Sequence, residues 1–345
     1  MTRLDVDDLR EFAGLDGPFF TVAVPTPSQL DDSTHRMSVE WSNLRRQLDD
    51  RWTEPELAEV DAVIEQLPHD GGAALVVMHS ATGATHAEFI DEPVSRPYVS
   101  EGDAPVLSLL IEARQRTLPH LVIETDRTGA DITAFDGGRL LAVEQVAGDT
   151  EHIHRGHPGG WSQRRFQQRA ENTWERNADD VADAATELAD QVGAVRIFVA
   201  GEVRAQTLVV EAVSAKSQIP VVALAAGDPD GIADEVVRLL SSHVAAEVTE
   251  LADQVKSRLG TGGATVDPAE VLRWLSEGKV KTLLVHDDLD GEVDETTTGQ
   301  SIGGLPAGTR LVDAAILAGL RSGADIVVVP RLAAMEGPIA ALARW

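Results

Sequence analysis

The chain has 345 residues, with 57 acidic and 29 basic side chains, a formal net charge of −28 and no cysteine. Its length predicts two or three domains, and the lack of cysteine excludes disulfides and thiolate metal sites. The negative charge argues against a general nucleic-acid-binding protein, because counterion release needs clustered cations.

A membrane location is not predicted. No apolar run approaches the roughly 20 residues that span a bilayer. The charged start MTRLDVDDLR does not resemble a signal peptide. We therefore expect a cytoplasmic protein that makes no contact with a membrane.

Residues 1–117 have the pattern of an N-terminal α/β domain. Strands are predicted for residues 18–26, 73–78 and 85–90, and helices for residues 39–48, 56–67 and 105–116. No group of nucleophiles or metal ligands stands out in this part of the chain. His35, His79 and His86 are interpreted as surface or structural residues.

A central domain is predicted for residues 118–260. The expected strands are 121–126, 130–135, 140–146, 195–200 and 221–225. The expected helices are a long helix that follows the N-cap Ser162 and runs to residue 192, and helices at 204–213 and 230–259. Asp136-Gly137-Gly138 is a predicted hairpin turn. An antiparallel start followed by alternating strands and helices favours a mixed sheet with helices on its faces.

The stretch 151–192 joins a segment rich in His, Gly and Pro to a long amphipathic helix. The apolar stripe of this helix consists of Phe166, Ala170, Trp174, Val181, Ala185, Leu188 and Val192. Arg165, Arg169 and Arg176 fall roughly opposite the stripe, and Ser162 is the predicted N-cap. Helix N-termini and guanidinium groups both suit phosphate. The pattern fits a rigid helix whose tip meets RNA, and it also fits a plain surface helix behind a Gly-rich loop.

The C-terminal domain is predicted for residues 261–345. A helix over 268–277 follows the N-cap Asp267, and the remaining expected elements are a strand at 280–286, a helix at 314–322 and a strand at 325–329. Residues 287–308 form an acidic loop rich in Thr and Gly, which we interpret as a flexible insertion.

At the tip, HPGGWSQRRFQQRAE resembles the central domain of the archaeal and eukaryotic peptide-chain release factor and Pelota superfamily. There a Gly-Gly-Gln tip precedes a helix that begins Ser-x-x-Arg-Phe. The equivalent places here are held by Gly159, Gly160, Ser162, Arg165 and Phe166.

Three C-terminal segments are similar to the ribosomal-protein-like domain of the same superfamily: WLSEGKVKTLLVHDD, DAAILAGLRSGADIVVVP and GPIAALARW. The resemblance covers about residues 118–345 and points to the bacterial branch, which includes a ribosome hibernation factor and mycobacterial relatives. It implies an α/β protein of three domains, with a mixed-sheet, RNase H-like central domain and a ribosomal-protein-like α/β/α C-terminal domain.

One departure from the family pattern bears on the chemistry. The Gln of the release-factor tip is Trp161 here. An indole has one donor and no acceptor, so it cannot orient a hydrolytic water as that tip does. It can stack on an exposed base.

The resemblance therefore implies a non-catalytic factor that occupies the ribosomal A site, in hibernation or in recognition of stalled ribosomes, with its tip near the peptidyl-transferase centre. It implies a translational GTPase of the elongation factor Tu type as a further partner, and no cofactor. The residues predicted to contact ribosomal RNA are His152, His154, Arg155, His157, Gly159, Gly160, Trp161, Arg164, Arg165 and Arg169.

Two other functions are considered for the same tip. In a ribosome-dependent peptidyl-tRNA hydrolase or tRNA nuclease of ribosome rescue, His154, Arg155 and His157 would serve acid–base and charge-stabilising roles. In a zinc site, His152, His154 and His157 would be ligands, but no carboxylate pattern follows them, so no metal is predicted. No Gly-x-Gly-x-x-Gly follows a strand, which argues against a dinucleotide site.

Overall fold

The structure is a computed structural model that describes residues 4, 6–26, 33–48, 50–67, 72–91, 93–116, 118–126, 128–136, 139–148, 161–286, 309–330, 335 and 337–345. The side chains of residues 33–34 and 161–170 are outside this description. The chain divides into two compact units, Arg3–Gln115 with Ala245–Trp345, and Arg116–Val244. Of the helices in the described ranges, none combines the length and the apolar character needed to cross a membrane.

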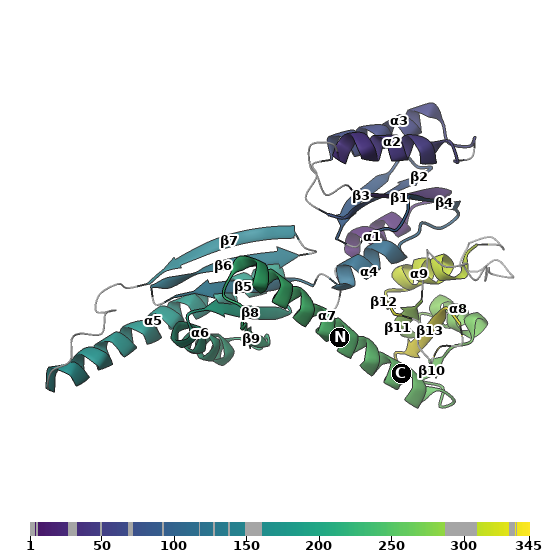
Figure 1. Cartoon of the computed structure of the whole chain (residues 1–345). Coiled ribbons are helices and arrows are strands. Elements are labelled where there is room, and N and C mark those ends of the chain that lie inside the picture. The colour runs from purple at the N-terminus through teal and green to yellow at the C-terminus, as the bar shows by residue number, and fades with distance from the viewer. Residues whose placement is uncertain are drawn as a thin grey trace. The chain divides into compact units, whose positions relative to one another are not determined.

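The N-terminal part of the first unit is an antiparallel sheet of order β3-β2-β1-β4 (Figure 1). Its strands are β1 (Phe19–Pro25), β2 (Ala74–Ser80), β3 (Thr85–Ile90) and β4 (Tyr98–Gly102). Its helices are α1 (Asp7–Ala13), α2 (Ser33–Arg45), α3 (Glu54–Gln66) and α4 (Ser108–Arg116). Successive residues of β1 face opposite sides of the sheet. Phe20 and Val22 join the core beneath α2 and α3, whereas Phe19 and Ala23 join the core beneath α1 and α4.

The C-terminal part of the same unit has a sheet of order β10-β13-β11-β12. Its strands are β10 (Ala264–Thr265), β11 (Val280–Val285), β12 (Asp325–Val328) and β13 (Ile339–Ala343), and its helices are α8 (Pro268–Ser276) and α9 (Leu311–Ser322). The predicted N-cap is confirmed, because Asp267 Oδ1 accepts a hydrogen bond from Glu270 N at 2.8 Å.

The two parts of this unit share one hydrophobic core, in which Leu9 and Phe12 of α1 belong with Ile316 and Leu320 of α9. Their junction also has a paired polar contact. The side chain of Gln115 donates to Val328 O at 2.8 Å and accepts from Val328 N at 3.0 Å. The amide thereby satisfies both backbone groups of a residue in an edge strand.

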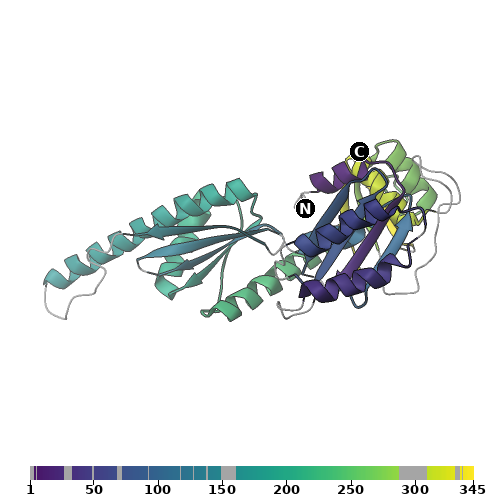
Figure 2. The ribbon, with the colours of Figure 1, turned by 90° about the horizontal axis from the view of Figure 1, so that it is seen from above.

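The second unit is a mixed sheet of order β7-β6-β5-β8-β9. Its strands are β5 (His120–Thr125), β6 (Gly129–Asp136), β7 (Arg139–Ala147), β8 (Arg196–Gly201) and β9 (Val221–Ala223). Strands β5, β6 and β7 are antiparallel, and β8 and β9 add in parallel. Helices α5 (Trp161–Val192) and α6 (Val203–Lys216) pack on one face of the sheet and form its core (Figure 2). The predicted mixed α/β fold is confirmed.

Helix α7 (Pro229–Arg258) begins in the second unit and ends in the first, in agreement with the helix predicted for 230–259.

Several short elements were not predicted, and one cap prediction was wrong. Helix α1 and strands β4, β10 and β13 are too short or too weakly patterned to give a periodic signal. Ser162 lies inside α5, which begins at Trp161, so it is not the N-cap. The loop predicted for 287–308 lies outside the described residues.

Candidate functional site

The residues predicted to contact RNA lie at the limit of the described structure. His152, His154, Arg155, His157, Gly159 and Gly160 lie outside the described residues. Trp161, Arg164, Arg165 and Arg169 lie in the first turns of α5, where the backbone is helical and the side chains are outside the description. Gly148 and α5, which flank residues 149–160 in the sequence, are described.

Helix α5 is anchored along only part of its length. It has 32 residues, which corresponds to about 48 Å at 1.5 Å per residue. Its described buried face includes Trp174, Val181, Ala185 and Leu188 of the predicted stripe, and Arg176 is exposed as predicted. The N-terminal turns of α5 extend beyond the ends of β6 and β7 (Figures 1 and 2). We call residues 161–172 the arm.

Close contacts fix the base of the arm. At the end of β7, Gly148 N donates to Thr128 O at 2.6 Å. A Cβ atom on Gly148 would overlap the side-chain amide of Asn177, which is buried on α5. Only glycine fits this position without displacing Asn177. The end of β7 therefore packs directly against α5 at Asn177. A shift of the arm at its base would disturb both β7 and α5.

A groove of about 560 Å³ opens at the same end of the sheet, lined in part by Glu124, Asp126, Asp131 and Gln145. We call it the acidic groove. Thr128 donates to Asp126 Oδ1 from both its hydroxyl and its backbone N–H, each at 2.6 Å. The Thr128 hydroxyl, as the main cause, lowers the pKa of the Asp126 carboxyl. Gln145 Nε2 donates to Asp131 Oδ1 at 2.8 Å.

The acidic groove is therefore unsuited to phosphate, because carboxylates line it and repel an anion. At the rim of the groove, the backbone at the carboxyl end of β8 lies very close to that of β5. Gly201 there has φ +128°, and a Cβ atom on it would overlap the carbonyl oxygen of Thr125. No local sequence pattern predicts this groove. Glu124, Asp131 and Gln145 lie side by side only because of the register in which β5, β6 and β7 pair.

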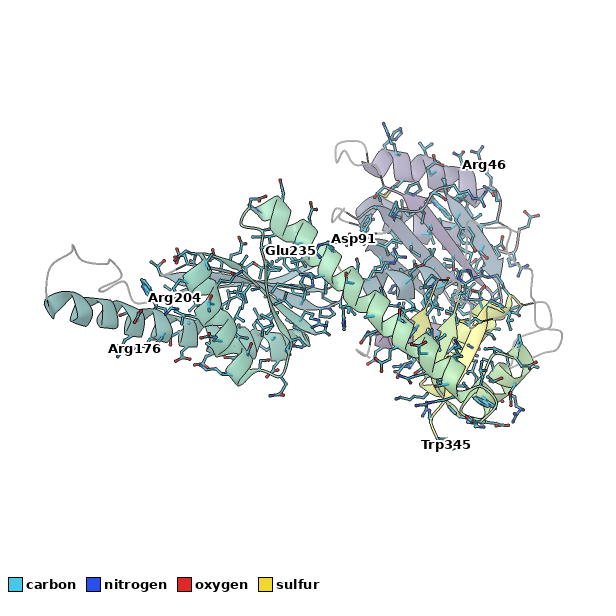
Figure 3. The ribbon with its side chains drawn as sticks, turned by 60° about the horizontal axis from the view of Figure 1, so that its bottom comes forward. Arg46, Asp91, Arg176, Arg204, Glu235 and Trp345 are labelled. Atoms are coloured by element: carbon cyan, nitrogen blue, oxygen red, sulfur yellow. The ribbon has the colours of Figure 1, made fainter. Side chains whose placement is uncertain are left out.

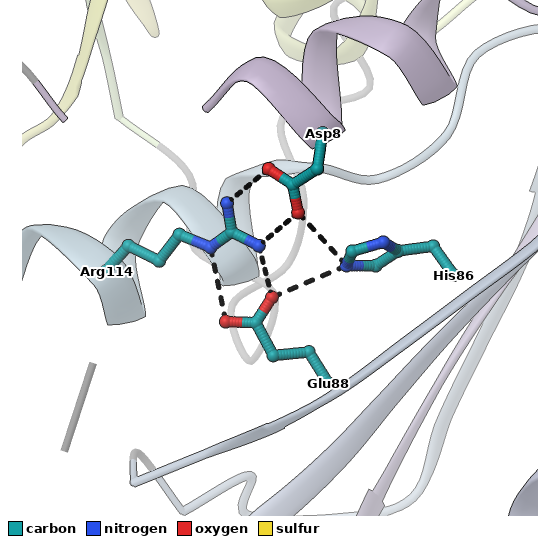
Figure 4. Close-up of polar contacts among 4 residues, drawn as sticks. All are labelled: Asp8, His86, Glu88 and Arg114. Atoms are coloured by element: carbon teal, nitrogen blue, oxygen red, sulfur yellow. Dashed lines mark hydrogen bonds and ion pairs between the residues drawn. The ribbon is translucent and has the colours of Figure 1, made fainter. Parts of the chain in front are cut away.

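A second polar cluster lies in the N-terminal sheet and joins α1, β3 and α4 (Figure 4). Arg114 donates to both oxygens of Asp8, at 2.7 Å each, and to Glu88, at 3.2 Å from Nε. His86 Nε2 lies 3.4 Å from Glu88 Oε2 and 3.9 Å from Asp8 Oδ2. The ligand atoms of Asp8, His86 and Glu88 lie within 4.8 Å of one another, a spacing that fits a metal.

The guanidinium group of Arg114 already fills this cluster. Burial by itself would raise the pKa of Asp8 and Glu88, but the bonds and charge of Arg114, with His86, hold both below their ordinary values. The two carboxylates in turn raise the pKa of Arg114. The cluster ties α1 and α4 to β3, and we interpret it as structural.

The other histidines of the N-terminal part are consistent with the expected surface or structural roles. His35 is exposed. His79 is buried, with its Nδ1 2.7 Å from Thr85 Oγ1 and its ring between Phe20 and Trp52.

Comparison with known proteins assigns the central segment. Residues 119–261 match bacterial archaeo-eukaryotic release factor family 2. The uncharacterized protein Rv2629 of Mycobacterium tuberculosis is 27% identical over 300 residues, which cover 84% of this chain and 79% of that protein.

Among solved structures, the chain is similar to archaeal Pelota in a model of ribosome-bound archaeal Pelota and ABCE1, at 15% identity and a TM-score of 0.46, covering all of this chain and 95% of the other. It is also similar to Dom34 of Saccharomyces cerevisiae, at 9% identity and a TM-score of 0.41, covering all of this chain and 94% of the other.

The matched range coincides with the segment predicted to form the central domain, and it contains the tip, the arm and the acidic groove. The motif around Gly159, Gly160 and Arg165 predicted the same assignment. The central segment of this chain, residues 119–261, is therefore similar in sequence to bacterial archaeo-eukaryotic release factor family 2.

Proposed function

We propose that this protein is a non-catalytic ribosome-binding factor that occupies the A site, in hibernation or in recognition of stalled ribosomes, with its tip near the peptidyl-transferase centre. The observation that carries the proposal is the arm, which extends α5 beyond the sheet from a base held by Gly148 and Asn177. Similarity to a translation-factor family supports a ribosome-associated role.

The distribution of charge supports one specific RNA contact. The chain as a whole is strongly acidic, with a formal net charge of −28, whereas Arg164, Arg165 and Arg169 gather on the arm. A local cationic patch on an acidic body favours one fitted RNA site over unspecific binding. His152, His154, Arg155, His157, Gly159, Gly160 and Trp161 complete the proposed contact.

The proposal includes a translational GTPase of the elongation factor Tu type as partner and a cytoplasmic location. It also keeps the division into domains at 1–117, 118–260 and 261–345. Family resemblance supports the GTPase partner.

A photo-crosslinker tests the position of the tip. Trp161 is replaced by p-benzoylphenylalanine, and the protein is irradiated on idle 70S ribosomes. We expect a crosslink to the large-subunit rRNA at the peptidyl-transferase centre, and the same analogue at Val203, an exposed residue of α6, should not give it. Crosslinks only to rRNA or proteins of the outer surface would contradict the proposal.

A turnover assay tests the absence of catalysis. Ribosomes carrying peptidyl-tRNA in the P site are incubated with the protein, and released peptide is counted. We expect no release above the buffer control, because an indole at position 161 cannot orient the attacking water. Release that is lost in a His154→Ala variant would establish the enzyme instead.

A further inference from the structure

Strand β7 forms one edge of the central sheet, and among the described residues no strand pairs with its outer side. Gly148 N donates to Thr128 O. Because hydrogen-bonded and non-hydrogen-bonded pairs alternate along an antiparallel ladder, the backbone N–H and C=O groups of Val143, Gln145 and Ala147 point away from β6. These groups are a template on which another strand can pair.

The same edge exposes apolar side chains. Leu140 is 55% exposed and Val143 is 63% exposed, although both residue types usually lie in a core. Edge strands are commonly protected by Lys or Pro, and β7, with the sequence RLLAVEQVA, has neither. The outer edge of β7 therefore has both the backbone groups and the apolar surface of a strand-docking site.

A row of acidic residues continues from this edge across the sheet. Gln145 of β7 lies opposite Asp131 of β6, and Asp131 lies opposite Glu124 of β5. Residues that lie directly opposite one another share a face of the sheet, so the row is on the face that carries Val143. All three residues line the acidic groove. A Lys or Arg side chain of a strand added beside Gln145 would thus extend across Gln145 toward Asp131, with Glu124 one strand further on.

We infer that β7 docks an extended, basic polypeptide segment of another protein as an additional strand. Its apolar side chains pack against Leu140 and Val143, and a Lys or Arg side chain enters the acidic groove toward Asp131. The charge selects this occupant. A second copy of the chain carries the same net charge of −28, and RNA phosphate is repelled by the carboxylates. The inference does not depend on the proposed ribosome function.

The probe is a fluorescein-labelled nine-residue peptide of alternating Val and Thr with Lys at its first and third positions. In an antiparallel pairing these positions lie beside the carboxyl end of β7. Fluorescence anisotropy with the full chain measures the dissociation constant, and a peptide with Gln in place of both Lys is the matched neutral probe. We expect the neutral peptide to bind about tenfold more weakly, because it lacks the charge-assisted hydrogen bonds of the Lys side chains.

Variants of the protein separate the backbone contact from the charge. Val143→Pro removes an N–H that points away from β6, so the ladder to β6 is kept while the docked strand loses a donor. We expect about tenfold weaker binding of the basic peptide. Val143→Thr keeps the N–H and the β-branched shape and should bind within twofold of the wild type.

Asp131→Asn keeps the acceptor for Gln145 and removes one charge from the groove, and Glu124→Gln removes another. Asp131→Asn should weaken binding of the basic peptide several-fold, and Glu124→Gln should weaken it less, because Glu124 lies one strand further from β7. Both should leave binding of the neutral peptide unchanged. Glu144→Gln is the control, because Glu144 lies opposite Ile132, a core residue on the other face of the sheet. It should bind the basic peptide like the wild type.

Hydrogen exchange on the wild-type chain gives a readout that needs no variant. On binding of the basic peptide, the amides of Val143, Gln145 and Ala147 should gain protection, whereas those of Glu144 and Val146, already bonded to β6, should change little. Lack of binding, equal binding of both peptides, or protection elsewhere would overturn the inference. So would full displacement of the peptide by an RNA hairpin, or dimerisation of the chain through β7 in sedimentation equilibrium.

Discussion

The arm and the acidic groove lie at the same end of the central sheet but carry opposite charge. The arm holds Arg164, Arg165 and Arg169 on the first turns of α5, and the groove holds Glu124, Asp126 and Asp131 at the ends of β5 and β6. The strand end at Gly148 belongs to both, since it lines the groove and packs against Asn177 at the base of the arm. We propose that these two surfaces of one domain select different partners, RNA for the arm and a basic polypeptide for the acidic groove.

The largest expected effect is a loss of stability when the rim of the acidic groove is disturbed at Gly201. A Cβ at Gly201 would overlap the carbonyl oxygen of Thr125, at a φ of +128°. Gly201→Ala should therefore lower the free energy of unfolding by about 3 kcal/mol, measured by urea denaturation. Gly227→Ala is the matched control: Gly227 also lines the groove, but nothing lies within 4 Å of a Cβ there. Equal stability of the two variants would show that the rim is not closely packed.

The next largest expected effect is a loss of ribosome affinity when the arginines of the arm are removed. Replacing Arg165 and Arg169 by Ala should weaken binding to 70S ribosomes about tenfold per residue, because each substitution removes a charge-assisted hydrogen bond to phosphate. The slope of log affinity against log salt should fall by about 0.9 for each phosphate that an arginine no longer neutralises. The measurement is co-sedimentation across a salt series.

Arg238→Ala is the control for this pair, because it removes the same charge from an exposed site of the central unit, paired with Glu235 near the start of α7 (Figure 3). Its affinity and salt slope should match those of the wild type. If all these variants behaved alike, the arm would have no special part in binding.

The smallest expected effect is on the pH dependence of stability, through Asp126 in the acidic groove. Hydrogen bonds from Thr128 lower the pKa of Asp126 in the folded chain, so the folded state binds fewer protons there than the unfolded state. The contribution of this carboxyl to stability is complete above its unfolded pKa, about 3.9, and is lost as the pH falls through the lower folded value.

Thr128→Ala should remove the share of that contribution that comes from the hydroxyl and keep the share from the backbone N–H. The loss is at most about 1 kcal/mol, because the carboxyl is exposed to solvent. Urea denaturation at pH 7 and at successively lower pH checks it. The difference between variant and wild type should shrink as the pH falls below about 4. A difference that grew with acidity would contradict the assignment.

Helix α5, whose first turns form the arm, was easier to predict than the acidic groove. Trp174, Val181, Ala185 and Leu188 recur with the period of a helix, and local periodicity fixes which face is buried. The family motif at Gly159 and Gly160 predicts a tip in front of this helix, and these residues lie outside the described part of the chain. The strands and helices of the central sheet followed from patterning of the same local kind.

The acidic groove could not be predicted, because it depends on register. Glu124, Asp131 and Gln145 form a row only when β5, β6 and β7 pair as they do, and a shift by one residue would send each side chain to the other face. The cluster of Asp8, His86, Glu88 and Arg114 was missed for a related reason. Its members come from three elements that tertiary packing brings together.

A cryo-EM map of the protein on idle 70S ribosomes tests the central claim most directly. The account predicts the arm in the A site, with Trp161 near the peptidyl-transferase centre, Arg165 and Arg169 against rRNA phosphates, and the acidic groove facing away from RNA. A map with the protein on the outer surface of the ribosome, or with the acidic groove against rRNA and the arm in solvent, would contradict it.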